Sequence, residues 1–257
     1  MRDLRRLVAV VTALVAWSAG AAEPAVTGTL RLDYFHTGGQ GVEIFAVDQV
    51  VLEPLPWPGH PARTVEAAAT GSYRFEVRGA DGKLLYSRGF SSIFGEWVTT
   101  AEAAASHRTF HESLRFPVPD GPVAITVFKR NPEQDFAAAW RTTVDPADMN
   151  VVRAAPPRHE PIAIEHNGVP ADRVDLLLVG DGYTPAECAT KFPADARRMA
   201  DALFRHEPYA ARRSDFNVWG LCPPSAESGV ARPSTGTHRR TPVGAAYDAF
   251  GSERYVL

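Results

Sequence analysis

Cysteine is scarce in this sequence of 257 residues, which contains only Cys188 and Cys222. Two cysteines without a Cys-x-x-Cys pair exclude a fold built on many disulfides, and they argue against a structural zinc site made of thiolates. The stability of the fold must therefore come from packing. The hydrophobic content of 45% and the charged content of 22% are typical of a globular protein with a real core.

Long hydrophobic runs are also missing. The apolar stretch at 7–17 is too short for a membrane span, which needs roughly 20 apolar residues. It follows three arginines and precedes the small residues at 18–22, which is the pattern of a secretory signal peptide. We therefore expect residues 1–22 to be a signal peptide that is cleaved after Ala22. The mature protein is expected to be secreted or periplasmic, with no membrane span.

The sequence has no excess of basic residues either. Its formal net charge at pH 7 is −3, and its lysines and arginines do not gather into a basic stripe. Proteins that bind nucleic acid usually carry such a stripe. Nucleic acid is therefore not expected as a partner.

Alternation of apolar and polar residues dominates residues 23–153. It recurs, together with short β-branched runs, in segments that we expect to be strands: 28–35, 71–78, 83–88, 107–118, 123–128 and 136–144. Asp81 and Gly82 are typical of the tip of a hairpin between two of these strands. Short strands separated by glycine and proline predict a β-sandwich. The stretch 154–171, which begins with alanine and proline, is interpreted as a linker.

From 172 to 257 the pattern changes to that of an α/β domain. Residues 174–179 are nearly all apolar, which predicts a strand buried on both faces. Thr184 and Glu187 have the spacing of a capping box, which predicts the start of a helix. A second strand is expected at 216–221. The two strands and the helix between them form a β-α-β unit, so the strands should be parallel.

Parallel strands end at one edge of their sheet, where open α/β sheets place their functional sites. The loops after both strands should meet there, and polar residues in them are candidates for lining a cleft: Asp181, Tyr183, Glu227 and Ser228. Asp181 is either a ligand or base, or a turn residue that hydrogen-bonds its own loop; we favour the turn. The same geometry brings Cys188 and Cys222 close together, either as a disulfide or as two separately buried thiols.

The sequence lacks the motifs of the common hydrolases. A zinc peptidase helix requires His-Glu-x-x-His, because residues i and i+4 share one helix face and bind one metal. His-Glu occurs at 111–112, 159–160 and 206–207, but the required second histidine is replaced by Arg115, Ala163 and Ala210. A Gly-x-Ser-x-Gly elbow is missing too, which weakens the case for an α/β esterase. No residue is assigned as catalytic, as a metal ligand or as a cofactor ligand.

Several blocks nevertheless resemble, in order, the opening of the catalytic domain of the IgA-peptidase family of zinc metallopeptidases. They are VDLLLVGDGYT at 174–184, FNVW at 216–219, PSAESGV at 224–230, TPVGAAY at 241–247 and FGSERY at 250–255. The resemblance covers about residues 165 to 257. The β-rich region before it is similar to the N-terminal domain that often precedes this catalytic domain. The implied fold is α+β and multidomain, with a β-sandwich followed by an incomplete α/β (zincin-type) peptidase domain.

The resemblance also implies the activity of an intact parent. In that family the His-Glu-x-x-His helix comes later in the chain, followed by a further metal ligand. We therefore expect the N-terminal portion of a secreted peptidase of protein or peptide substrates. Zinc is expected in the intact parent, whereas this chain should hold none and be inactive.

Two expectations remain open at this stage. The sequence ends on apolar residues, and two strands with one helix cannot cover both faces of a sheet, which favours a fragment over a small complete α/β layer. The rival function is a non-enzymatic secreted β-sandwich binding protein. A His-Glu-x-x-His motif downstream of codon 257 would favour the peptidase, and a stop codon there would favour the rival.

Overall fold

The computed structural model describes residues 28–68, 70–155, 160–253 and 255–257, so the expected signal peptide at 1–22 lies outside the described residues. The strands are β1 (Gly28–Gly39), β2 (Val42–Pro56), β3 (Tyr73–Gly79), β4 (Leu84–Phe90), β5 (Arg108–Pro117), β6 (Val123–Arg130), β7 (Phe136–Val144), β8 (Val152–Arg153), β9 (Ile162–Glu165), β10 (Val174–Val179) and β11 (Phe216–Leu221). The α-helices are α1 (Ile93–Trp97), α2 (Pro185–Thr190) and α3 (Phe192–Leu203). Of the helices in this part of the chain, none has the length and apolarity needed to cross a membrane.

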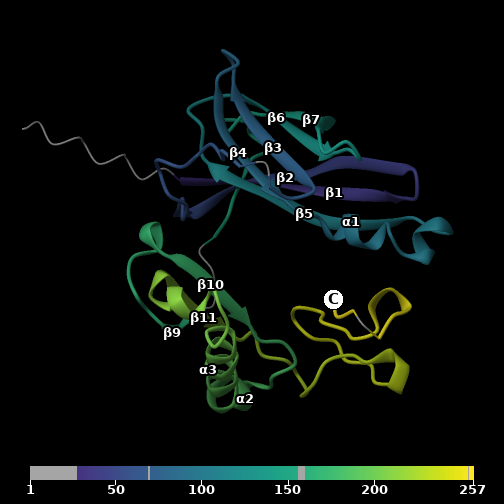
Figure 1. Ribbon diagram of the computed structural model, residues 1–257, viewed down its shortest axis with the longest axis vertical. Coiled ribbons are helices and arrows are strands. Elements are labelled where there is room, and N and C mark those ends of the chain that lie inside the picture. Colours follow the sequence, from purple (N-terminus) through teal and green to yellow (C-terminus); the bar gives the residue numbers. More distant parts are fainter. Residues whose placement is uncertain (1–27, 69, 156–159, 254) are drawn as a thin grey trace, which may run out of the picture.

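Two four-stranded sheets make up the first part of the chain, in the orders β5-β1-β2-β8 and β4-β3-β6-β7 (Figure 1). Alternation along the strands explains their packing, because every second side chain points between the sheets. The buried residues of β1 and β6, such as Leu30, Leu32 and Ile125, belong to one hydrophobic core. The expected β-rich fold is confirmed. The expected hairpin is present too, since β3 and β4 pair antiparallel on either side of Gly82.

The longest strand, β2, was not expected from the sequence. It pairs with β1 along its whole length, but the register shifts by one residue between Asp33 and Tyr34, which face Gln49 and Val47. Asp48 is therefore the extra residue of a β-bulge. The inward-facing positions of β2 change phase at this bulge, so the alternation that reveals a strand is broken in the middle.

A three-stranded sheet, in the order β10-β11-β9, forms the second part. β10 and β11 are parallel, as expected, with Val174 opposite Phe216. β9 lies within 154–171, the range assigned to a linker, and it pairs antiparallel with β11. The expected capping box is confirmed at the start of α2, where the Thr184 side chain accepts from the Glu187 amide and the Glu187 side chain accepts from the Thr184 amide.

The described residues leave one face of this small sheet uncovered. α3 packs on the other face, where Ala200 and Phe204 form a cluster with Val218 and the half-buried Leu176. β10 is an edge strand, and its alternate residues Leu177 and Val179 remain 49% and 48% exposed. The expectation that this strand is buried on both faces is therefore wrong, because within the described residues α3 covers only one face.

The C-terminal segment contacts the sandwich through Phe250. The ring of Phe250 meets the ring of Phe110 in β5 edge to face, with 6.3 Å between centroids. Phe250 packs against the cluster formed by Phe94 and Trp97, and the Arg108 guanidinium lies 5.4 Å from the centre of its ring. An aromatic contact thus joins the end of the chain to the region around α1.

Candidate functional site

The loops that follow the two parallel strands meet at one sheet edge, as the topology requires. The amide of Ser225 donates to the carbonyl of Tyr183 at 2.7 Å, and the amide of Gly229 donates to the carbonyl of Gly182 at 2.7 Å. Gly182 has φ +72, and a Cβ there would lie 2.5 Å from the Gly229 carbonyl oxygen. Only glycine fits this close approach of two backbones. The loops therefore form one compact layer.

Asp181 fastens a distant segment to this layer. Thr241 Oγ1 donates to Asp181 Oδ2 at 2.5 Å, and the amide of Ala245 donates to the same oxygen at 2.8 Å. The amide of Val243 reaches Oδ1 at 3.3 Å. Burial tends to raise the pKa of Asp181, but these hydrogen bonds outweigh it and hold the pKa below its ordinary value. Asp181 is therefore an ionised anchor for residues 241–245, and its bonds extend well beyond its own turn.

The other candidate residues hold loops to helices or lie on the surface. Tyr183 donates its hydroxyl to Asp195 in α3 at 3.0 Å. Ser228 donates to Oε1 of Glu187, the capping-box residue of α2, at 2.9 Å. Glu227 pairs with Arg239 at 3.3 Å, and its side chain is 58% exposed. Asp181, Tyr183 and Ser228 thus lie in one loop layer. The side chain of Glu227 is mostly exposed to solvent.

A cavity of about 400 Å³ lies beside this layer, between α2 and the end of β11. Its lining includes Phe192, Leu221 and both cysteines, and none of the four candidate residues. Cys188 and Cys222 form a disulfide with 5.7 Å between their Cα atoms, which ties α2 to the residue after β11. The disulfide holds the helix against the sheet edge.

The side chains described do not fit a catalytic zinc ion. One group of three possible ligands occurs in the described ranges, Asp33, Asp48 and His111, whose ligand atoms lie within 4.8 Å of one another. It belongs to the bulge of the sandwich, away from the peptidase-like sheet. Arg31 already donates to both carboxylate oxygens of Asp33, at 2.8 and 3.1 Å, and Gln49 donates to one of them. A guanidinium in this position repels a divalent cation, so no step through zinc is assigned to this chain.

A buried histidine lies at one end of the sandwich. His36 is fully buried, and its ring is stacked between Phe45 and Phe94, with centroids 4.2 and 4.1 Å away. Its Nε2 lies 2.9 Å from Glu43 Oε1, and its Nδ1 lies 3.2 Å from Glu112 Oε2. The imidazole therefore bridges two carboxylates that come from β2 and β5.

The electrostatics of this network favour a charged histidine. Burial lowers the pKa of His36, but hydrogen bonds to Glu112 and Glu43 outweigh it and raise the pKa above its ordinary value. Burial raises the pKa of Glu43, whereas hydrogen bonds from His36, Lys129 and Tyr73 bring it down to about 2. His36 and its two carboxylate partners all lie in the sheet that contains β1. Lys129 and Tyr73, which also bond Glu43, join this network to the other sheet. Its sequence signal was the polar residue that continues the inward series Leu30, Leu32, Tyr34, His36.

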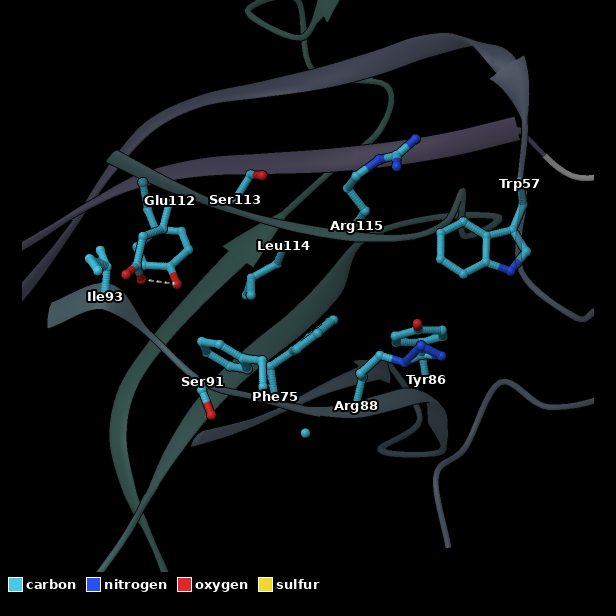
Figure 2. A pocket seen from close by; sticks show the side chains of 13 residues that line it. Trp57, Phe75, Tyr86, Arg88, Ser91, Ile93, Glu112, Ser113, Leu114 and Arg115 are labelled. Atoms are coloured by element: carbon cyan, nitrogen blue, oxygen red, sulfur yellow. Dashed lines mark hydrogen bonds between the residues drawn. The ribbon is translucent and has the colours of Figure 1, made fainter. Parts of the chain in front are cut away.

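A second feature missed by sequence reasoning is a cleft of about 510 Å³ between β4 and β5 (Figure 2). Aromatic side chains form much of its lining: Tyr34, Trp57, Phe75, Tyr86 and Phe90. Arg88 lies between Tyr86 and Phe90 on the same face of β4, because alternate residues of a strand share a face. The sequence signal for this cleft was the charged residue Arg88 between two aromatic residues on one face of a strand.

Comparison with protein families connects both parts of the chain to one kind of enzyme. A family model described as Peptidase M64 N-terminus matches residues 22–141, and one described as IgA Peptidase M64 matches residues 162–257. No curated protein matches the chain. The two matches define a protein related to metallopeptidases. The chain belongs to the IgA-peptidase family, with most of its sandwich in the N-terminal match and its three-stranded sheet in the peptidase match.

Proposed function

We propose that these residues form the N-terminal, non-catalytic portion of a secreted zinc metallopeptidase that hydrolyses protein substrates. The family of both parts of the chain supports the reaction class. His-Glu-x-x-His occurs nowhere in the 257 residues, and the described donors do not fit zinc. The residues that hold zinc and activate water therefore belong to a part of the peptidase outside this sequence, and this chain by itself cleaves nothing.

The open face of β10 carries this proposal. Leu177 and Val179 expose about half of their surface on an edge strand, although the strand is almost entirely apolar. Burial of apolar surface is worth about 25 cal/mol per Å², so a sheet normally packs a second layer on such a face. Further chain that covers Leu177 and Val179 would complete a zincin-type α/β domain and bring the zinc helix to this sheet.

We assign two tasks to this portion. The loop layer around Asp181 fixes residues 241–245 at the sheet edge, where it forms one wall of a substrate cleft in the complete domain. The sandwich supplies a separate surface that positions the substrate. Export is supported by the arginines, the short apolar run and the small residues of 1–22, and by the disulfide, which persists in oxidising compartments.

Sequencing the DNA downstream of codon 257 tests the proposal. We expect the reading frame to continue into a His-Glu-x-x-His motif. The longer protein should then bind zinc and hydrolyse a protein substrate, and it should lose hydrolysis when the glutamate of that motif is replaced by glutamine. A stop codon directly after Leu257, or a longer protein that neither binds zinc nor cleaves, would contradict it.

The cleft between β4 and β5 favours one other function, a secreted binding protein with the sandwich as its working part. A pocket of about 510 Å³ is within the range of ligand-binding sites. The same sequencing experiment separates the two functions, since only the peptidase needs a downstream zinc motif.

A further inference from the structure

The cleft of the sandwich lies between the edge strands of its two sheets. β4 ends one sheet and β5 ends the other, and the cleft opens between them. Figure 2 shows Phe75 and Leu114 in its middle, Trp57 at one end, and Ile93 with Glu112 at the other. The position is set by the sandwich architecture, since two twisted sheets diverge at their edges.

The floor of the cleft is apolar and buried. Phe75, Tyr86 and Leu114 belong to the main hydrophobic core and are each less than 5% exposed. The charged groups of the opposite wall, Glu112 and Arg115, already have partners. Glu112 accepts from Tyr34 at 2.7 Å, and Arg115 donates its Nε to Glu53 at 3.1 Å. A ligand therefore meets an apolar surface with few unmet hydrogen-bonding groups, which suits a hydrophobic side chain and does not suit a sugar.

Arg88 is the exception in this lining. It occupies a core-facing position of β4, between the half-buried Phe90 and the buried Tyr86, but the cleft leaves its side chain exposed. Across the ranges that the structure describes, no carboxylate lies within ion-pair distance of its guanidinium. An arginine in an apolar cleft with no acidic partner is complementary to a carboxylate, which it binds through two parallel hydrogen bonds.

Within the described ranges β5 pairs only with β1, so its other edge is open, and this edge indicates how a ligand approaches. The cleft is lined by positions 112–115, whereas β5 runs from Arg108 to Pro117 and so extends past the cleft at both ends. The edge of β4 is less open, because Val65 bridges to it at Ser87. An extended segment can add to the free edge of a sheet by backbone hydrogen bonds, and its alternate side chains then enter the pockets on one face.

We propose that this cleft binds an extended segment of another protein, paired along β5, with a hydrophobic side chain in the cleft and a carboxylate on Arg88. The hydrophobic side chain is aromatic or branched aliphatic and packs on Phe75 and Leu114. The acid is Asp or Glu two positions away, because residues i and i+2 of a strand share a face. The carboxylate belongs to a side chain, since a strand along β5 continues past both ends of the cleft. The site needs no zinc, so it stands whether or not the chain is part of a peptidase.

Selection from a phage-displayed library of random seven-residue peptides on the purified chain tests the proposal. Enriched peptides should carry an aromatic or branched aliphatic residue two positions from Asp or Glu. A synthetic labelled peptide with this pattern should bind about tenfold or more weakly when its acid becomes an amide, or when the protein carries Arg88→Met, since hydrogen bonds to charged groups are worth at least that ratio. The matched control is Arg197→Met, an exposed arginine of α3, which should bind as the parent does.

Reversing the charge at position 88 distinguishes a loss of carboxylate recognition from a loss of folding. The Arg88→Glu variant, checked by its thermal unfolding, should enrich peptides in which Lys or Arg replaces the acid. Selection without an acid preference, the same acid preference with Arg88→Glu, or preferential binding of an acidic oligosaccharide over every selected peptide would overturn the proposal.

Discussion

The hydroxyl of Thr241 lies 2.5 Å from the carboxylate of Asp181, although 60 positions separate the two residues in the sequence. Together with the amide of Ala245, this contact brings the C-terminal segment to the end of β10. A hydrogen bond to a charged group contributes about 1.5–3 kcal/mol. The carboxylate of Asp181 therefore contributes directly to holding residues 241–245 on the sheet edge.

Replacing Asp181 by Asn should release this segment without unfolding the sheet. The neutral amide loses the charge-assisted bonds, so the protection of the Ala245 amide should fall by a factor that corresponds to about 1.5–3 kcal/mol. Hydrogen exchange measured by mass spectrometry or NMR gives this factor. Asp120→Asn, in an exposed turn, is the control and should leave Ala245 protected. Unchanged exchange in Asp181→Asn would show that the segment is held by other contacts.

The Cys188–Cys222 disulfide should stabilise the small α/β unit. The bond closes a loop between residues 34 positions apart, and loop-closure entropy then predicts about 4 kcal/mol. The paired variant Cys188→Ala with Cys222→Ala should therefore lower the protection of β11 amides, while amides in the core of the sandwich stay protected. A reducing agent should have the same effect on the parent and none on the variant. Equal protection of β11 in both proteins would argue against a stabilising bond.

The His36 network should make the stability of the sandwich depend on pH in two directions. The folded pKa of His36 is raised above 6.5, so its contribution is complete below about pH 6.5 and is lost as the pH rises through the folded pKa. The folded pKa of Glu43 is lowered from 4.5 to about 2, so its contribution is present above about pH 4.5 and is lost as the pH falls toward 2. The free energy of unfolding should therefore be greatest between about pH 4.5 and about pH 6.5.

Urea denaturation at a series of pH values measures this profile. His36→Gln should remove the decline above pH 6.5, because no group in the network then loses a proton in that range. His111→Gln is the matched control, since this histidine is exposed, and it should keep the decline. If the parent and His36→Gln lose stability alike above pH 6.5, the histidine is neutral in the folded protein.

Export should remove the first 22 residues. The small residues Gly20 and Ala22 stand at the positions that signal peptidase reads, so the mature protein should begin at Glu23. Mass spectrometry of the protein recovered outside the cytoplasm gives its N-terminus. Ala22→Asp should block cleavage, and an exported parent that retains Met1 would refute the assignment.

Local patterns predicted much of the fold. Alternation, together with short β-branched runs, marked most strands of the sandwich, and the spacing of Thr184 and Glu187 marked the start of α2. The strand β2 was not predicted, because the bulge at Asp48 reverses the alternation of its inward-facing residues. The burial of β10 was predicted wrongly because composition reports that a strand is apolar, whereas exposure depends on which layers surround it.

The candidate site was harder to predict, since its contacts join distant positions. The loop that contains Asp181 was expected at the sheet edge, but its partners at 241–245 lie beyond any local pattern. Arg88 is an ordinary arginine in the sequence. Only the divergence of β4 from β5 turns it into a cation inside an apolar cleft.

The zinc content of the purified chain shows whether the catalytic centre lies within these 257 residues. The protein of 257 residues would be incubated with an equal amount of zinc, freed of loosely bound metal by gel filtration, and assayed by metal analysis together with hydrolysis of a protein substrate. We predict far less than one zinc ion per chain and no hydrolysis. One retained zinc ion per chain, with hydrolysis that a chelator abolishes, would contradict the claim that the catalytic centre lies outside these residues.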